Sequence, residues 1–165
     1  MADSVTIKRD VVLRAIVTER LKEQLDDEFS EAIEQIDERI TQLDVGARQY
    51  VTELQRSDIQ QAMALRQQIE AEKRRFRQAK DQLIQRQRHV QELEEGTEII
   101  RGTIESHAEL TVGDNIQTVL RGIEVVVRDD EVIEIRETEG GISVESDQEV
   151  TPQVAEVETP TIERP

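Results

Sequence analysis

The sequence contains no cysteine and no tryptophan, and its only aromatic side chains are one tyrosine and two phenylalanines among 165 residues. Without cysteine the chain forms no disulfide and has no thiolate that could serve as a nucleophile or metal ligand, as is usual in reducing compartments. Globular domains of this length bury much of their apolar area as aromatic rings. The scarcity of rings therefore argues against a thick hydrophobic core.

Long apolar stretches are also missing. No run approaches the roughly 18 consecutive apolar residues that a membrane-spanning helix needs. The opening segment, Met1 to Asp10, lacks the apolar region of a secretory signal peptide. Together with the missing cysteine, these patterns predict a cytoplasmic protein that does not associate with membranes.

Charge is plentiful and mostly negative. The chain has 37 acidic and 21 basic residues, which gives a net charge of −16. This balance disfavours non-specific binding to nucleic acid, because such binding relies on neutralising phosphates with basic side chains. It disfavours anionic membrane surfaces for the same reason. A composition with 35% charged residues and few aromatics is typical of long helices that bury a narrow apolar seam.

The middle of the sequence carries the apolar spacing of two paired helices. Seam residues that recur at steps of three and four form the a/d pattern of a coiled coil. A first run reads Ile33, Ile36, Ile40, Leu43, Ala47, Tyr50 and Leu54, and a second reads Ala62, Leu65, Ile69, Glu72, Phe76, Ala79, Leu83, Arg86, Val90 and Leu93. Glu72 and Arg86 are charged, and we expect their stems to lie in the seam while their charged ends reach solvent.

The two runs are out of phase between Leu54 and Ala62, so a continuous helix would rotate its seam there. We therefore predict an antiparallel hairpin over residues 18–95 with its turn at residues 56–58. Ser57 followed by Gln60 fits a capping box at the start of the second helix, and Gly96 is the expected stop after Glu95. Each helix would have about 38 residues and a length of roughly 55–60 Å.

Opposed charge runs favour the antiparallel direction. Helix one is acidic in its first half, and helix two carries a basic stretch that consists of Lys73, Arg74, Arg75, Arg77, Lys80, Arg86 and Arg88. A turn near Ser57 would place this stretch beside residues 27–42, whose acids include Glu28, Glu31, Glu34, Asp37 and Glu38. Each exposed pair contributes less than about 1 kcal/mol, but a parallel arrangement would bring like charges together.

The segments that flank the hairpin alternate with the period of two that is typical of β-strands. Within residues 4–17, Val5 to Arg9 reads as a strand and the apolar residues 11–16 as a lead-in to helix one. Within residues 96–137, residues 98–112 alternate, and residues 123–128 and 132–136 flank Asp129–Asp130 as a β-hairpin. The predicted fold is α+β, with a long antiparallel coiled-coil hairpin and a small antiparallel sheet built from both chain ends. Residues 138–165, which hold all three prolines and many acids, are predicted to be a disordered acidic tail.

Two separated blocks resemble the bacterial YlqD family. They are residues 5–25, VTIKRDVVLRAIVTERLKEQL, and the closing Val112-Gly-Asp-Asn with residues 123–137, IEVVVRDDEVIEIRE. The resemblance spans about residues 4–137. The family usually has Asp-Gly at the closing turn where this chain has Asp129–Asp130, so the resemblance implies the β-hairpin but not a two-residue turn. It implies a fold and supplies no catalytic residues. The genes of the family often lie near ribosome-maturation genes, which implies a link to translation.

Three groups of residues are candidate sites. The basic stretch could bind RNA phosphates, but the acids of helix one are expected to neutralise it, and exposed rings for base stacking are missing. The hairpin tip, Glu53, Arg56, Ser57 and Asp58, could hold a metal ion through carboxylates, as the tips of transcript-cleavage factors do. Arg56 between the acids favours an ordinary capped turn. His89 and His107 do not cluster with other ligands, so no metal site is predicted.

Nothing in the sequence has the spacing of a nucleophile elbow or a phosphate-binding loop, and a two-helix hairpin offers little concave space for a substrate. We expect no enzyme activity and no cofactor. The leading hypothesis is a structural or adaptor protein that presents the hairpin to a protein partner. A homodimer is the simplest form of self-association, because two helices cover their seam only partly. The alternatives are a ribosome- or RNA-associated factor that uses the basic stretch, and a holdase-like chaperone.

Overall fold

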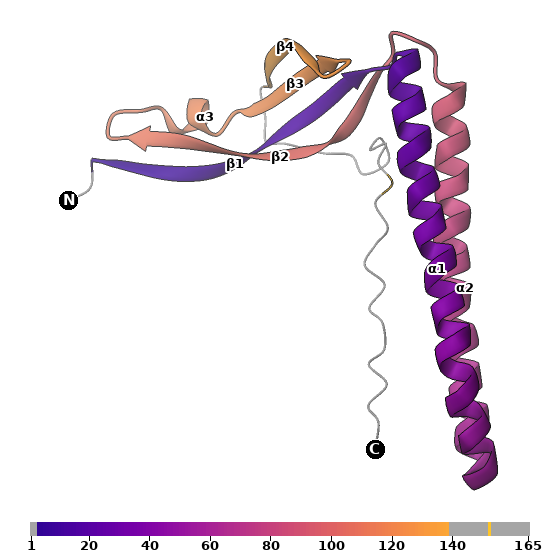
Figure 1. The fold of residues 1–165 in the computed structure, drawn as a ribbon. Coiled ribbons are helices and arrows are strands. Elements are labelled where there is room, and N and C mark those ends of the chain that lie inside the picture. Colours follow the sequence, from indigo (N-terminus) through magenta and orange to yellow (C-terminus); the bar gives the residue numbers. More distant parts are fainter. Residues whose placement is uncertain (1–2, 139–151, 153–165) are drawn as a thin grey trace. The chain divides into compact units, whose positions relative to one another are not determined.

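The computed structural model describes residues 3–138 and Pro152, so the predicted acidic tail lies outside the described residues apart from Thr138 and Pro152. The elements in chain order are β1 (Ser4–Ile16), α1 (Glu19–Ser57), α2 (Ile59–Glu92), β2 (Glu98–Thr111), α3 (Ile116–Val119), β3 (Gly122–Arg128) and β4 (Glu131–Thr138) (Figure 1). The described residues group into a sheet unit, residues 3–25 and 90–138, and a helical unit, residues 26–89. Between residues 3 and 138, no helix combines the length and the apolar character that crossing a membrane requires.

The predicted helical hairpin is confirmed, and a single residue, Asp58, separates its two helices. The Asp58 carboxylate accepts hydrogen bonds from the backbone N–H groups of Gln60 and Gln61 at 3.0 and 3.2 Å. The assignment of Ser57 as the N-cap of α2 was wrong, because Ser57 is still part of α1 and its hydroxyl donates to the Leu54 carbonyl at 3.3 Å. A capping side chain must come from the residue just outside the helix, and here that residue is Asp58.

The second helix ends at Glu92, earlier than the predicted Glu95. Gly96 adopts a positive φ of 87° in the turn that follows. Its N–H donates to the Val17 carbonyl at 2.8 Å, and the Val17 N–H donates to the Thr97 carbonyl at 2.8 Å. Gly96 therefore reverses the chain between α2 and β2, where glycine tolerates the left-handed conformation, and does not directly end the helix.

Both chain ends contribute to one four-stranded sheet in the order β2-β1-β3-β4. β1 pairs antiparallel with β2 from Ser4 to Ile16, and β3 pairs antiparallel with β4. The prediction of a wholly antiparallel sheet was wrong for β1 and β3, which pair in parallel over residues 11–15 of β1. The apolar residues 11–16, which were predicted to lead into helix one, belong to β1 because they pair with a neighbouring strand along their whole length.

The turn between β3 and β4 contains only Asp129 and Asp130, with positive φ angles of 47° and 71°. Two consecutive residues with positive φ are the signature of the type I′ hairpin turn. The turn is thus as tight as the Asp-Gly turn of the resembled family, although Asp130 occupies the glycine position. The Thr18 hydroxyl donates to Asp129 and the Arg20 guanidinium to Asp130 at 3.2 Å, which supports this conformation from the start of α1.

Candidate interaction surfaces

Several predicted seam positions of the helical unit are buried, and one of them carries a charged side chain. Ile36, Phe76 and Leu83 are all buried. Glu72 is buried as well, with its side chain only 9% exposed, so the expectation that its carboxylate reaches solvent was wrong. One carboxylate oxygen has no hydrogen-bond partner among the described residues, and the other lies 3.5 Å from an Arg75 nitrogen. Arg86, the other charged seam residue, is exposed as expected.

A buried lysine beside Glu72 ties the two helices together. The Lys73 side chain is 10% exposed, and its ammonium donates to Asp44 of α1 at 2.8 Å and to Glu70 at 3.2 Å. The hydrogen bond to Asp44 raises the pKa of Lys73, and the same bond lowers the pKa of the Asp44 carboxyl. Both shifts favour the charged forms, so the pair is charged at neutral pH.

Further contacts fix the antiparallel direction of the hairpin. The Lys80 ammonium donates to both Asp37 oxygens at 2.7 and 2.6 Å. The Gln87 amide donates to Asp26 at 3.0 Å and to Ser30 at 3.1 Å. Residues with higher numbers on α2 contact residues with lower numbers on α1, from Lys73 with Asp44 to Gln87 with Asp26. This is the antiparallel order that the charge pattern predicted.

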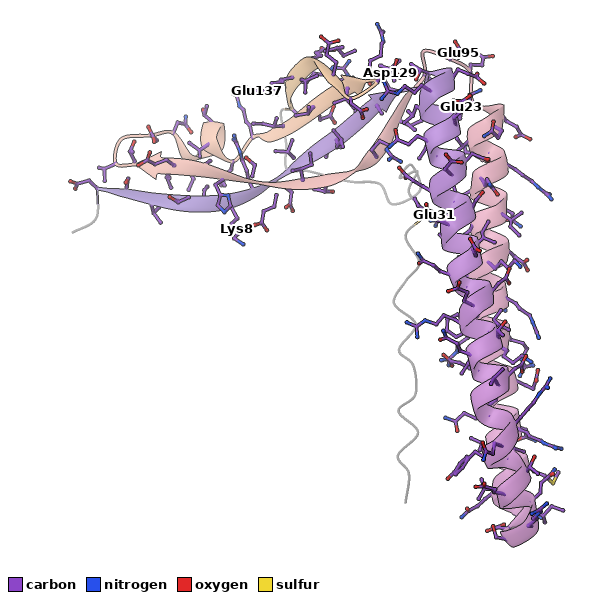
Figure 2. The ribbon with its side chains drawn as sticks, viewed as in Figure 1. Lys8, Glu23, Glu31, Glu95, Asp129 and Glu137 are labelled. Atoms are coloured by element: carbon purple, nitrogen blue, oxygen red, sulfur yellow. The ribbon has the colours of Figure 1, made fainter. Side chains whose placement is uncertain are left out.

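Neutralisation of the basic stretch is incomplete. Lys73 and Lys80 pair with acids of α1, and Arg75 pairs within its own helix with Glu72. Arg74 and Arg88 are exposed, and neither forms an ion pair or hydrogen bond within residues 3–138. Three of the acids expected to face the stretch also form no ion pair among the described residues, namely Glu31, Glu34 and Glu38, and Figure 2 shows Glu31 on α1. Exposed arginines therefore remain on α2.

The hairpin tip has the character of a capped turn. Glu53, Arg56 and Ser57 are exposed, whereas the Asp58 carboxylate is used to cap α2. Among the residues that the structure describes, no three histidine or carboxylate side chains gather in a way that could hold a metal ion. His89 and His107 are both exposed.

A groove that sequence reasoning missed opens between the helices in the half of the hairpin nearer the tip. It encloses about 280 Å³ and is lined by Asp44, Ala47, Arg48, Val51 and Thr52 of α1 and by Arg66, Ile69 and Glu70 of α2. Apolar residues outside the a/d spacing were the available signal: Val51 is buried, while Val45 and Met63 are 66% and 54% exposed. Helical spacing places Val45 on the same face as Arg48 and Met63 on the same face as Arg66.

In the sheet unit, charged side chains gather on one face. Arg14 of β1 donates to Glu124 of β3 at 3.1 and 3.2 Å. Arg136 of β4 donates to Glu98 of β2 at 2.9 and 2.7 Å, and to Glu134 at 2.7 Å. These hydrogen bonds lower the pKa values of the Glu98 and Glu134 carboxyls and raise the pKa of Arg136. An ion pair thus joins the two outer strands of the sheet.

Comparison with known proteins places the chain in a family. Residues 5–136 match the family described as YlqD protein. A crystal structure of a protein of unknown function from Synechococcus sp. WH 8102 is similar at 31% sequence identity and a TM-score of 0.70, over 83% of this chain and 99% of that one. No curated protein is similar enough to count as a match. Because the family match spans most of the chain, including both strand-forming ends and the whole hairpin, the chain belongs to the YlqD family.

Proposed function

We propose that this chain is a non-catalytic cytoplasmic adaptor that presents its helical hairpin, as a coiled coil, to a protein partner. The groove beside Ala47, Val51 and Ile69 is the observation that supports this proposal most directly. Two helices packed only against each other cannot cover all of their apolar surface. The groove and the exposed Val45 and Met63 beside it are apolar surface of the hairpin that a partner could cover.

The chemistry of the groove favours an amphipathic helix as the partner. Its apolar lining would accept the apolar face of a third helix, which is a common mode of peptide recognition. Both signs of charge line it, with Asp44 and Glu70 against Arg48 and Arg66. A partner helix with mixed charges along its edges would pair with these residues, whereas a purely acidic or purely basic one would meet repulsion on one side.

Affinity purification of the full chain from its native cell, with nuclease present, tests the adaptor. The variant Val45→Asp with Met63→Asp adds two charges at exposed positions beside the groove, so the hairpin should keep its fold. Gln35→Asp with Gln85→Asp is the matched control, because it adds the same charges at exposed sites on the same helices away from the groove. A protein that is retained by the wild type and the control but lost from the Val45 and Met63 variant supports the proposal. A protein set that is unchanged in that variant contradicts it.

The second candidate is an RNA- or ribosome-associated factor, which the exposed Arg74 and Arg88 favour. Arg74→Glu with Arg88→Glu should abolish salt-dependent retention on RNA, because phosphate contacts dominate such binding. Arg39→Glu with Arg56→Glu, at exposed positions elsewhere on the hairpin, is the control and should retain it. An absence of wild-type retention at low salt removes this candidate.

A further inference from the structure

The side of α2 that faces away from the seam carries a concentration of exposed arginines. Within residues 74–88 these are Arg74, Arg75, Arg77, Arg86 and Arg88, and we call them the arginine face. Arg74, Gln78 and Arg88 lie on one stripe of this side, because positions at steps of three and four share a face of a helix. Asp81 is the one exposed acid within residues 74–88. The surface is therefore locally positive, although the chain as a whole is acidic.

Part of this positive charge has no partner in the described part of the chain. Arg74 and Arg88 form no ion pair or hydrogen bond within residues 3–138. Arg75 lies 3.5 Å from Glu72, yet 69% of its side chain is exposed. Over the rest of residues 3–138, exposed acidic side chains outnumber exposed basic ones. Within the described residues, the arginine face is therefore the surface that attracts a polyanion most strongly.

The sequence itself contains such a polyanion. Residues 139–165, the acidic tail beyond Thr138, lie outside the described residues. They include seven acidic residues and one arginine, which gives a net side-chain charge of −6. Three of these acids, Glu145, Asp147 and Glu149, fall within five consecutive residues. The charge of the tail is thus complementary to that of the arginine face.

We propose that the acidic tail binds the arginine face of α2 in its own chain and thereby shields it from other polyanions. The outer side of α1 is a poor alternative on the hairpin, because Glu31, Glu34 and Glu38 are exposed there and repel the tail. At physiological ionic strength, charges more than about 8 Å apart are largely screened. Local charges, and not the net charge of the chain, therefore decide where the tail binds.

The tail is long enough to reach the arginine face for any orientation of the sheet unit, in which β4 ends. When extended, its 27 residues span up to about 90 Å. The longest strand of the sheet unit, β2, measures about 46 Å. The arginine face ends about 24 Å along α2 from Val90, where the sheet unit resumes. Reach therefore does not limit the contact.

The expected contact is weak in each part and depends on the tether. An exposed ion pair contributes less than about 1 kcal/mol. A flexible tether holds the tail at an effective concentration that reaches the millimolar range, so a few such pairs are enough to populate the bound state. The contact should weaken as ionic strength rises, because the charges on both sides are exposed to solvent.

Paramagnetic relaxation enhancement in the full chain tests the proposal. The natural sequence has no cysteine, so one introduced cysteine carries the only spin label. The probe label is placed at Gln78→Cys, which is exposed on the stripe between Arg74 and Arg88. The control label is placed at Gln35→Cys, which is exposed among the acids of α1. Broadening of the amide signals of residues 139–165 reports how near the tail comes to each label, and circular dichroism verifies that each labelled protein is folded.

The probe label should broaden the tail signals at least about threefold more than the control label, and this excess should disappear at about 0.5 M salt, where screening acts beyond about 4 Å. Arg74→Glu with Arg88→Glu should also remove the excess. Arg39→Glu with Arg56→Glu, which makes the same charge change at exposed positions elsewhere on the hairpin, should leave it in place.

Equal broadening from the two labels at low salt overturns the proposal. An excess that survives either high salt or the Arg74 and Arg88 variant does so as well. In a mixture of labelled and unlabelled chains, broadening of the unlabelled tail to the same degree would place the tail on a second copy and would also overturn it. The measurement uses no RNA, so its outcome is separate from that of the RNA-associated candidate, and it does not depend on the groove.

Discussion

We expect Glu72→Leu to raise the free energy of unfolding of the helical unit, because the wild-type carboxylate is buried in the seam without sufficient partners. Its side chain is 9% exposed, and one oxygen has no hydrogen-bond partner within residues 3–138. The other oxygen lies 3.5 Å from a guanidinium nitrogen of Arg75, and the Arg75 side chain is 69% exposed. A pair with one partner in solvent contributes less than about 1 kcal/mol. An unsatisfied buried acceptor costs about 1–3 kcal/mol.

Within residues 3–138, Lys73 is the other charged side chain that is buried, and it does not depend on Glu72. Lys73, the neighbouring buried charge, is bound by Asp44 and Glu70 and not by Glu72. Leucine also matches glutamate closely in helix propensity and adds apolar area to the seam. Replacing buried charged groups by apolar residues of similar volume stabilises proteins by about 1–4 kcal/mol in comparable cases. We expect a gain of about 2 kcal/mol, which corresponds to about 4–8 °C in melting temperature for a chain of this size.

Thermal and urea denaturation followed by circular dichroism at the helix band measures this gain. Glu31→Leu is the control, because Glu31 is exposed on α1 and its replacement should change stability by less than about 0.5 kcal/mol. Glu72→Gln keeps a buried polar group and should stabilise less than leucine. A Glu72→Leu protein that is no more stable than the wild type would refute the reasoning, since it would mean that the buried carboxylate is fully compensated.

Four further substitutions test other parts of the structure. Gly46→Ala should stabilise α1 by about 1 kcal/mol, because a Cβ at this position meets no atom within 4 Å; urea denaturation measures it, and a loss of stability would contradict an open helical site. Asp58→Ala should destabilise the hairpin by about 1 kcal/mol through loss of the cap, which the same measurement detects, whereas an unchanged midpoint would assign the cap no energetic role. Asp130→Gly should stabilise the sheet unit by some tenths of a kcal/mol to about 1 kcal/mol, because glycine adopts positive φ without strain; amide hydrogen exchange of β3 and β4 reports it. Arg136→Met should reduce stability at neutral pH but not in acid. The hydrogen bond from Arg136 lowers the pKa of Glu98 in the folded protein, so the ionised carboxylate stabilises the fold at pH values above 4.5, its ordinary pKa, and this contribution is lost as the pH falls through the folded pKa. A loss of stability that is the same at every pH would refute this prediction.

The helical part of the fold was predictable because its signal is local. The a/d spacing and the break in phase before Ala62 identified two helices and their turn, and opposed charges gave their direction. The capping residue was misplaced by one position, because Ser57 and Asp58 are both good caps and only the structure shows where α1 ends. The burial of Glu72 could not be predicted, because a seam glutamate reaches solvent or not according to the rotamer that its neighbours allow.

The sheet was harder to predict because its pairings are not local. Alternation identified the strands but could not show that Val11 to Ala15 would pair in parallel with residues 123–127. A bulge opposite Leu13 and Arg14 shifts the phase of β2 between Ile100 and Gly102, so strict alternation cannot place Ile100 and Gly102 on their correct faces. Which side chains share a face of the sheet is known only from the pairing of all four strands.

The hydrogen bonds that join Val17 to Gly96 and Thr97 have a consequence for folding. β1 is completed at residue 16, but its first partner, β2, begins only at residue 98. In an unstructured chain that separation would impose a large loop-closure entropy, and pairing would be slow. A hairpin that forms first from contacts near its own turn converts this long loop into a short one, since its two ends meet at Val17 and Thr97. We therefore expect the sheet to pair after the hairpin has formed, and variants with a less stable hairpin to assemble the sheet more slowly.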